Sequence, residues 1–257
     1  MKETYKGTLG LMLAFILAGG LACNGGGDGD GVSFNPVQTV VGSGNIVQET
    51  RSVTGATGVN MGGVANLTIE QGAPEELILQ TDDNLLALVL TDVQGGILGI
   101  RSAPGFDLQP SQTMEANLRL ISIDSITLSG VGGITVTDLT TNQLELTKSG
   151  VGGIDIFNLD AQTLDVLMSG IGGISVDGGQ VDDQLITLTL GSLGDYNAEN
   201  LSSLTAVVMI AGSGSATVRV NTTLNANITG SGTVFYHGSP VVTRTGNGSG
   251  SVVQLSP

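Results

Sequence analysis

The chain has 257 residues, with 23 acidic and 8 basic side chains, one His, one Cys and no Trp. A single His and a single Cys exclude a metal cage built from these residues and a Cys–His nucleophile pair within the chain. The net charge of −15 argues against a nucleic-acid partner, because that binding depends on Lys and Arg that neutralise phosphates. The 40% hydrophobic content is too high for a disordered chain, and 41 glycines indicate many turns.

The N-terminus has the pattern of a secretion signal. Two lysines precede Leu9–Ala22, an uncharged apolar run shorter than the ~20 residues that span a bilayer. The run ends at Cys23 and resembles a bacterial lipoprotein signal, so we predict a signal peptide over residues 1–22 and a lipid anchor on Cys23. The alternative is ordinary signal-peptidase cleavage near Ala18–Ala22. Either route takes the protein out of the cytoplasm.

Residues 23–38 form a Gly- and Asp-rich segment that predicts a flexible tether between the anchor and the folded domain. Asp28 and Asp30 could also contribute to a weak Ca²⁺ site, although no Glu follows at the spacing of an EF-hand. Asn24 after the cysteine is compatible with sorting to the outer membrane or cell surface, with a periplasm-facing location as the alternative. The absence of any later Cys means that no disulfide staples the fold.

An internal repeat of about twenty residues is the main structural signal in the chain. Three segments align directly, Asp124–Gln143, Leu144–Thr163 and Leu164–Gln184, and weaker copies follow to residue 257. Each repeat has a strand of alternating apolar residues, an SGxG turn and a second alternating strand. Such a short unit cannot bury its own apolar face, so we predict an all-β parallel solenoid of roughly six coils stacked at ~4.8 Å.

Equivalent apolar residues should stack in columns along this solenoid. The expected columns are Ile126/Leu146/Val166/Leu188/Val208/Ala226 and Leu128/Lys148/Met168/Leu190/Ile210/Ile228 in the first strand, and Ile134/Ile154/Ile174/Tyr196/Ala216/Val234 in the second. The SGxG glycines should form a structural ladder at one corner, where positive φ and close backbone approach favour Gly. These glycines are Gly130, Gly132, Gly150, Gly152, Gly170 and Gly172.

The region before the repeats predicts an N-terminal β cap. We expect a single domain over residues 39–257, with the cap in 39–122 and the repeats in 123–257. The cap would protect the open strand edges of the first coil. Its expected elements are strands at Asn66–Glu70, Leu77–Gln80, Leu86–Thr91 and Leu98–Arg101, a loop at Phe106–Met114, and a lead-in at Asn117–Ser122.

Several motifs in order resemble one protein family. GSGNI (Gly42–Ile46), the segment Thr54–Gly72, TDDNLL (Thr81–Leu86) and the serial SGxG coils are similar to the putative auto-transporter adhesin head GIN domain family of bacterial envelope proteins. The resemblance covers Gly42 to Gly250 and implies a right-handed, β-helix-like solenoid. It supplies no catalytic residues. The family's usual coil reads SGSGD, whereas the best copies here read SGVGG or SGIGG, and Asp195 alone keeps the acid.

Few residues remain that could carry chemistry. We expect the carboxylates to be solvated surface groups, with cation or glycan contact, or catalysis on a groove, as alternatives. They are Asp155, Asp160, Asp165, Asp177, Asp182, Asp183 and Asp195. Lys148 interrupts an apolar column, so its ammonium should either reach solvent beside Ser149 or pair with Glu145 or Asp165. His237 is expected at the surface, and Phe235 and Tyr236 are expected to cap the solenoid.

These observations predict a non-catalytic envelope lipoprotein whose solenoid presents a surface for adhesion, binding or structure. No catalytic residue, metal site or cofactor is predicted, and the expected partners are the membrane, through the lipid anchor, and a protein or glycan ligand. The alternatives are a carbohydrate-active enzyme on a β-helix and a periplasmic module that binds a regulatory partner.

Overall fold

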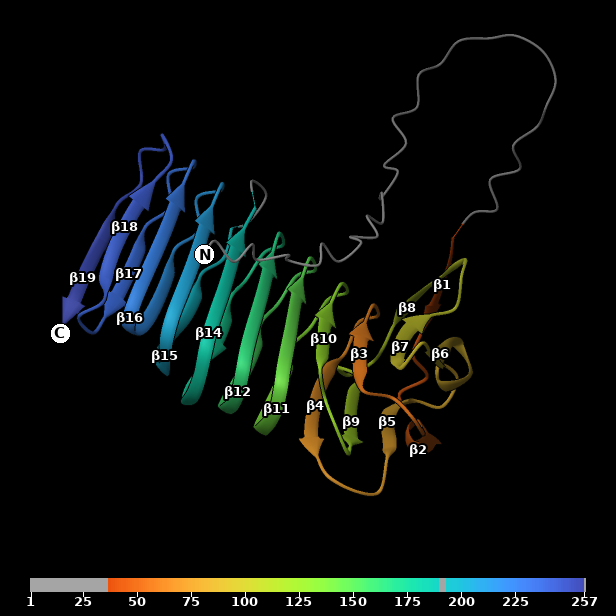
Figure 1. Cartoon of the computed structure of the whole chain (residues 1–257). Helices are drawn as coiled ribbons and strands as arrows, with labels where there is room; N and C mark the ends of the chain where they lie inside the picture. Colours follow the sequence, from red (N-terminus) through yellow and green to blue (C-terminus); the bar gives the residue numbers. More distant parts are fainter. Residues whose placement is uncertain (1–36, 190–192, 257) are drawn as a thin grey trace, which may run out of the picture. The chain divides into compact units, whose positions relative to one another are not determined.

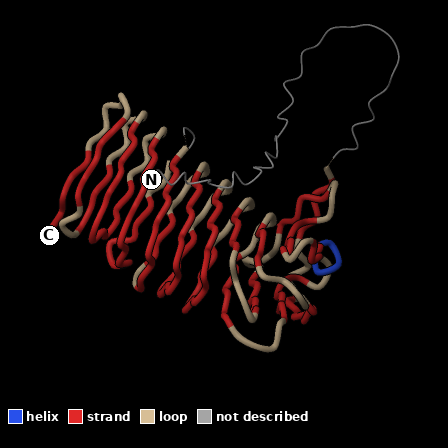
Figure 2. Tube along the Cα trace, in the orientation of Figure 1, coloured by secondary structure: helices blue, strands red, loops and turns tan. Residues whose placement is uncertain are grey.

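The structure is a computed structural model that describes residues 37–189 and 193–256 (Figure 1). This part of the chain is almost entirely β-strand and turn, with one short 3₁₀ helix, η1 (Leu86–Leu88) (Figure 2). The predicted signal peptide, Cys23 and nearly all of the predicted tether lie outside the described residues. No helix among the described residues is long and apolar enough to span a membrane.

The repeats stack as a parallel β-solenoid of about six turns, which confirms the predicted fold class. β11 (Ile134–Lys148) lies between β10 (Ser125–Leu128) and β12 (Ile154–Met168), and all three run parallel (Figure 1). The stack continues through shorter and longer strands that all pair in parallel. They are β13 (Ile174–Val176), β14 (Gly179–Leu188), β15 (Tyr196–Ile210), β16 (Ala216–Ile228), β17 (Val234–His237), β18 (Val241–Thr245) and β19 (Val252–Ser256).

Each long strand bends without leaving the hydrogen-bonded ladder. In β11 the buried side chains alternate at Ile134 and Val136, resume at Leu139, and resume again at Leu144. Two adjacent residues face solvent at each break, so the strand turns and presents three successive inward segments. Burying each Leu or Ile contributes about 1.5–3 kcal/mol, and the stacked columns therefore supply most of the stabilising burial.

The register confirms the column from Ile134 to Val234 and corrects the other two at the fourth coil. The structure places Ile186 and Leu188 there, rather than Leu188 and Leu190. The register steps by 20 residues from Met168 to Leu188 but by 22 from Leu188 to Ile210. The two extra residues therefore fall between Leu188 and Tyr196, not at the end of the preceding repeat.

The solenoid also extends into the region expected to be only a cap. β3 (Gly58–Met61) and β4 (Asn66–Gln71) form a coil in register with β10 and β11. A further coil, made by β7 (Ile97–Ser102) and β9 (Glu115–Leu120), stacks on the other side of that one. The signal was present in the sequence, because Met61–Leu67 (MGGVANL) matches LSGVGGI in the first repeat.

The cap itself consists of antiparallel strands beside the outermost coil. β2 (Ile46–Ser52) pairs with β5 (Glu76–Asp82), β5 pairs with β9, and β6 (Val89–Gln94) pairs with β7. The prediction of a loop over Phe106–Met114 is wrong for its first residues, because β8 (Phe106–Gln109) is a strand that pairs in parallel with β1 (Gln38–Val41). The strand expected at Leu86–Thr91 begins instead with η1, so that only its second half joins β6.

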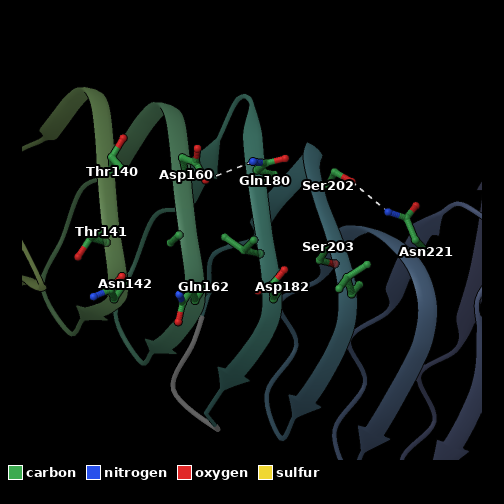
Figure 3. A pocket seen from close by; sticks show the side chains of 13 residues that line it. Thr140, Thr141, Asn142, Asp160, Gln162, Gln180, Asp182, Ser202, Ser203 and Asn221 are labelled. Atoms are coloured by element: carbon green, nitrogen blue, oxygen red, sulfur yellow. Dashed lines mark hydrogen bonds between the residues drawn. The ribbon is translucent and has the colours of Figure 1, made fainter.

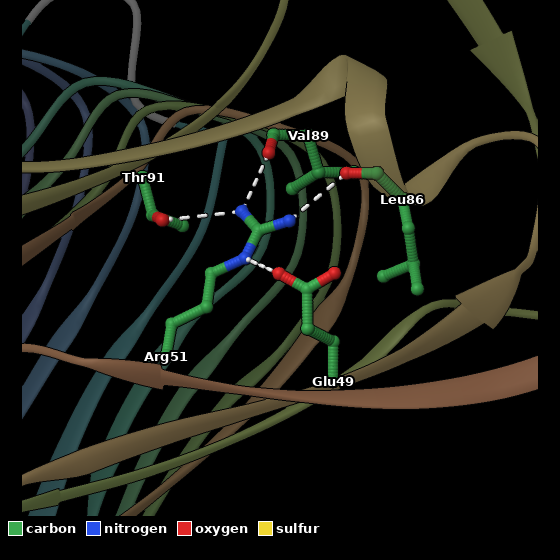
Figure 4. Close-up of polar contacts among 5 residues, drawn as sticks. All are labelled: Glu49, Arg51, Leu86, Val89 and Thr91. Carbon is green, nitrogen blue, oxygen red and sulfur yellow. Dashed lines mark hydrogen bonds and ion pairs between the residues drawn. The ribbon is translucent and has the colours of Figure 1, made fainter.

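Arg51 of β2 holds the 3₁₀ helix against the cap (Figure 4). Its guanidinium donates to the carbonyl oxygens of Leu86 and Val89 at 2.9 and 2.6 Å. It also donates to Thr91 Oγ1 at 3.1 Å and to the carboxylate of Glu49 at 2.7 Å. Each of the three guanidinium nitrogens of Arg51 therefore donates to an acceptor, and these bonds hold η1 and the start of β6 against β2.

Asp82, at the end of β5, also holds separate segments of the cap together through hydrogen bonds. Its buried carboxylate accepts hydrogen bonds from Ser111 Oγ at 2.6 Å, from the Ser111 amide at 2.9 Å and from the Gly44 amide at 2.7 Å. These bonds, led by the Ser111 hydroxyl, lower the pKa of Asp82 below its ordinary value. The TDDN motif thus ties two distant loops to the cap.

Candidate functional site

One corner of the solenoid is built from stacked glycines. A β-carbon on Gly150 would overlap the carbonyl oxygen of Gly130, and one on Gly170 would overlap that of Gly150. Gly132, Gly152 and Gly172 have φ values of +136°, +129° and +102° and lie equally close to the preceding coil. Backbone packing therefore accounts for these glycines without a ligand.

The same corner carries a row of exposed aliphatic side chains. Val64, Val131, Val151 and Ile171 form successive parallel bridges, and each is about half exposed. They occupy the position of the second serine in the family's SGSGD coil. We name this row the aliphatic ridge.

Lys148 lies beneath the ridge, and neither expectation for it is correct. Its side chain is 0% exposed, in the column between Leu128 and Met168. The ammonium donates to the carbonyl oxygen of Ile171 at 2.8 Å, not to Glu145 or Asp165, which alternate to the outer face. Loss of solvation lowers the pKa of Lys148.

A hollow in the described surface lies at a different corner, where β11, β12, β14 and β15 bend. It has a volume of about 560 Å³ and crosses the coils rather than following one strand (Figure 3). Its lining residues come from the same place in successive repeats. They are Thr140, Thr141, Asn142, Asp160, Ala161, Gln162, Gln180, Val181, Asp182, Ser202, Ser203, Leu204 and Asn221.

Three consecutive positions in each coil give this groove a floor and two rims. The floor follows the register from Thr141 through Ala161 and Val181 to Ser203, and the last three are only 8%, 4% and 1% exposed. The rims flank this floor in Figure 3. One rim is Thr140, Asp160, Gln180 and Ser202, and the other is Asn142, Gln162, Asp182 and Leu204.

The rims supply hydrogen-bonding groups at the coil spacing of ~4.8 Å. Gln180 donates to Asp160 at 3.4 Å, and Asn221 donates to Ser202 at 3.0 Å. Hydroxyl and amide groups both donate and accept, and the carboxylates accept, whereas Lys, Arg and His are absent from the lining residues. Such a surface suits a neutral or amine-bearing polar chain and disfavours an anionic one.

The other acids are distributed around the coils. Asp155 lies on a different outer face, where loss of solvation and the charge of Asp177 raise its pKa. Asp165 stacks beside Glu145, Asp183 accepts from Thr205, and Asp195 accepts from the Ser215 amide at 2.7 Å. No group of three His, Cys, Asp or Glu side chains in residues 37–189 and 193–256 is close enough to hold a metal ion.

The aromatic pair near the C-terminus does not cap the solenoid. Phe235 and Tyr236 lie in β17, and the coil of β18 and β19 stacks on them. His237, which was expected at the surface, is half-buried in the same strand.

The fold is a parallel solenoid with an open polar groove, and sequence comparison names its family. The model of the family described as "putative auto-transporter adhesin, head GIN domain" matches residues 56–240. The chain belongs to this family. No curated protein sequence matches the chain significantly.

Solved structures share the fold. A putative adhesin from Bacteroides fragilis is 23% identical, with a TM-score of 0.80, over 84% of this chain and 100% of that one. A putative lipid binding protein from Parabacteroides distasonis is 22% identical, with a TM-score of 0.71, over 85% and 100%. A putative adhesin from the same species is 21% identical, with a TM-score of 0.66, over 85% and 100%. At these identities the likeness concerns the fold alone.

Sequence reasoning did not find the groove. It selected Asp160 and Asp182 but missed their neutral neighbours Asn142, Gln162 and Gln180. The available signal was two adjacent polar residues that interrupt the apolar alternation at the same place in each repeat, as Asn142 and Gln143 do in β11.

Proposed function

We propose that this protein is a non-catalytic adhesin-like component of the cell envelope, held by a lipid on Cys23, that binds an extended glycan along the polar groove. The observation that carries the proposal is the repetition of the rims and floor in successive coils. A polymer of polar units can meet equivalent groups at each coil, so that weak contacts add along its length.

Three features favour a polar polymer over a compact ligand. The groove is open along the solenoid, its rims are almost all polar, and its floor is formed by small or short side chains. The carboxylates of Asp160 and Asp182 can accept hydrogen bonds from sugar hydroxyls or amines. The family's description as an adhesin supports the same class of role.

The arrangement of charge favours binding over catalysis. A glycoside hydrolase uses a proton donor and a second carboxylate placed on either side of one bond. Asp160 and Asp182 lie in the groove, but the other candidate acids face elsewhere, and the lining contains no Lys, Arg or His to assist.

Groove binding can be tested with a bulky substitution on the floor. Thr141→Trp fills the hollow, whereas Thr147→Trp adds the same bulk on another outer face of β11. Chito- and cello-oligosaccharides are the probes, with oligogalacturonate as an anionic comparison. The proposal expects the wild type and Thr147→Trp to bind a neutral or amine-bearing probe and Thr141→Trp to lose that binding. Equal binding by both variants would contradict it.

The anchor has a separate test. Intact mass and membrane fractionation of the wild type are compared with Cys23→Ala. The proposal expects diacylglycerol mass and membrane partition in the wild type alone. An unlipidated, soluble wild type would overturn the anchor and leave groove binding to be judged on its own experiment.

A further inference from the structure

The last coil leaves two strand edges without a neighbour among the described residues. β18 pairs with β16, and β19 pairs with β17, each on one side only. All five residues of β18 are exposed. An edge of this kind presents unpaired backbone N–H and C=O groups and is a template for another strand.

The side chains at this edge do little to prevent pairing. Val241 and Leu255 are 72% and 50% exposed. Arg244 is the charged residue of β18, and it turns onto its own coil, where it donates to the carbonyl oxygens of Gly248 and Gly250 at 3.0 Å. The edge strands of the cap differ, because β2 carries Glu49 and Arg51, and β6 carries Asp92. Charged side chains on an edge oppose association.

Charge is also segregated along the chain. Glu199 is the last acidic residue, and the segment after it carries Arg219, Arg244 and His237. Two copies of a chain with net charge −15 repel one another through most surfaces. The C-terminal coils carry no acidic side chain after Glu199, so this repulsion is weakest at that end of the solenoid and a second copy can approach there at least cost.

We propose that the C-terminal coils of two copies pair edge to edge, with β18 antiparallel to β18 of the second copy about a two-fold axis at Thr243. In this register Thr243 faces its own counterpart, Val241 faces Thr245, and Val242 faces Arg244. The two arginines do not face each other. A two-fold contact uses the same edge on both copies and closes, so it forms a dimer rather than a fibre.

Dimerisation through this end places the two grooves on one particle and leaves both accessible. A polymer or a surface that meets both grooves would bind more tightly than either groove alone provides. The pairing is a separate property of the chain and does not depend on the identity of the groove ligand.

A cysteine crosslink tests the register. Facing residues of antiparallel strands have β-carbons about 4.5–5.5 Å apart, close to disulfide range. Full-length Thr243→Cys should form a disulfide-linked dimer on a non-reducing gel. The wild type controls for Cys23, and Thr135→Cys places a thiol on an outer face in the middle of the solenoid. Absence of the dimer in Thr243→Cys, or an equal amount in Thr135→Cys, would overturn the proposed contact.

Replacing Thr243 by a charged residue tests the same contact without a covalent bond. Two differently tagged copies of the full chain are co-expressed and one is purified. We expect wild-type copies to co-purify, and Thr243→Glu or Thr243→Lys to reduce co-purification at least about tenfold when each is paired with itself. The mixed Glu and Lys pair should recover it. Undiminished co-purification of the Glu pair, failure of the mixed pair to recover, or no association of wild-type copies would contradict the proposal.

Discussion

The ammonium of Lys148 donates to the carbonyl oxygen of Ile171, 2.8 Å away, inside a column that is otherwise apolar. A buried charge with so little compensation costs free energy, and replacing such a group by an apolar one of similar volume is often stabilising. The next coil already shows the replacement, because Met168 occupies the equivalent position.

We therefore predict that Lys148→Met raises the free energy of unfolding by about 1 kcal/mol or more at neutral pH. The pKa of Lys148 is lowered in the folded state, so protonation opposes folding at pH values below that lowered pKa. The stability of the wild type should rise as the pH increases toward 10.5, and the advantage of Lys148→Met should shrink. Denaturant unfolding at pH 7 and pH 10 measures both. A less stable variant, or a constant difference, would show that the ammonium is adequately compensated.

At the glycine corner, Ala substitutions at neighbouring positions should differ sharply in how much stability they cost. Gly150→Ala puts a β-carbon into the carbonyl oxygen of Gly130 and should cost at least about 2 kcal/mol, as overpacking does. At Gly153 the nearest atoms to a new β-carbon are at 3.7 Å, so Gly153→Ala should change stability by no more than about 1 kcal/mol. Thermal unfolding of both variants is the measurement. Similar losses in the two would refute the steric account of the ladder.

The hydrogen bonds of Asp82 should make the stability of the fold depend on pH in the acidic range. Its lowered pKa means that its contribution to stability is present above the unfolded value near 3.8 and is lost as the pH falls through the folded value. Asn cannot accept all three hydrogen bonds, because its amide group is a donor. Asp82→Asn should therefore be less stable than the wild type at pH 7, and the two should converge below pH 3.8. Urea unfolding across this range tests the effect, and a gap that persists at low pH would contradict it.

Tyr196 and Gln184 form a buried polar pair. The phenol donates to Gln184 Oε1 at 2.9 Å, while Gln184 Nε2 is buried and has no hydrogen-bond partner within residues 37–189 and 193–256. Tyr196→Phe leaves the oxygen unpaired as well and should cost about 1–3 kcal/mol. Gln184 stacks between Leu164 and Ala206, so adding Gln184→Leu should recover most of that loss. A double variant no more stable than Tyr196→Phe would indicate that packing, not hydrogen bonding, dominates.

Local sequence patterns predicted the coils well because each repeat carries the same alternation of apolar residues and the same glycine turn. The alternation around Ile134, Ile154 and Ile174 identified both the strands and their register. The error at Leu188 arose because two extra residues could be placed in either corner when only the alternation was known. The pairing of Leu188 with Met168 and of Tyr196 with Ile174 shows that they fall between Leu188 and Tyr196.

Non-local pairings could not be predicted in the same way. β3 lies against β10, which follows it by more than sixty residues, and the coil of β7 and β9 is placed on its other side. The groove at Asn142 and Gln162 depends on how several bent strands align. The surroundings of Lys148 depend on a carbonyl group in the next coil.

The most direct test of the account is the binding of chito- and cello-oligosaccharides by the wild type, Thr141→Trp and Thr147→Trp, measured by calorimetry. The account predicts binding by the wild type and Thr147→Trp, little binding by Thr141→Trp, and weak binding of oligogalacturonate by all three. Failure of the wild type to bind any of these probes, or equal binding by the two tryptophan variants, would contradict the groove as a glycan site.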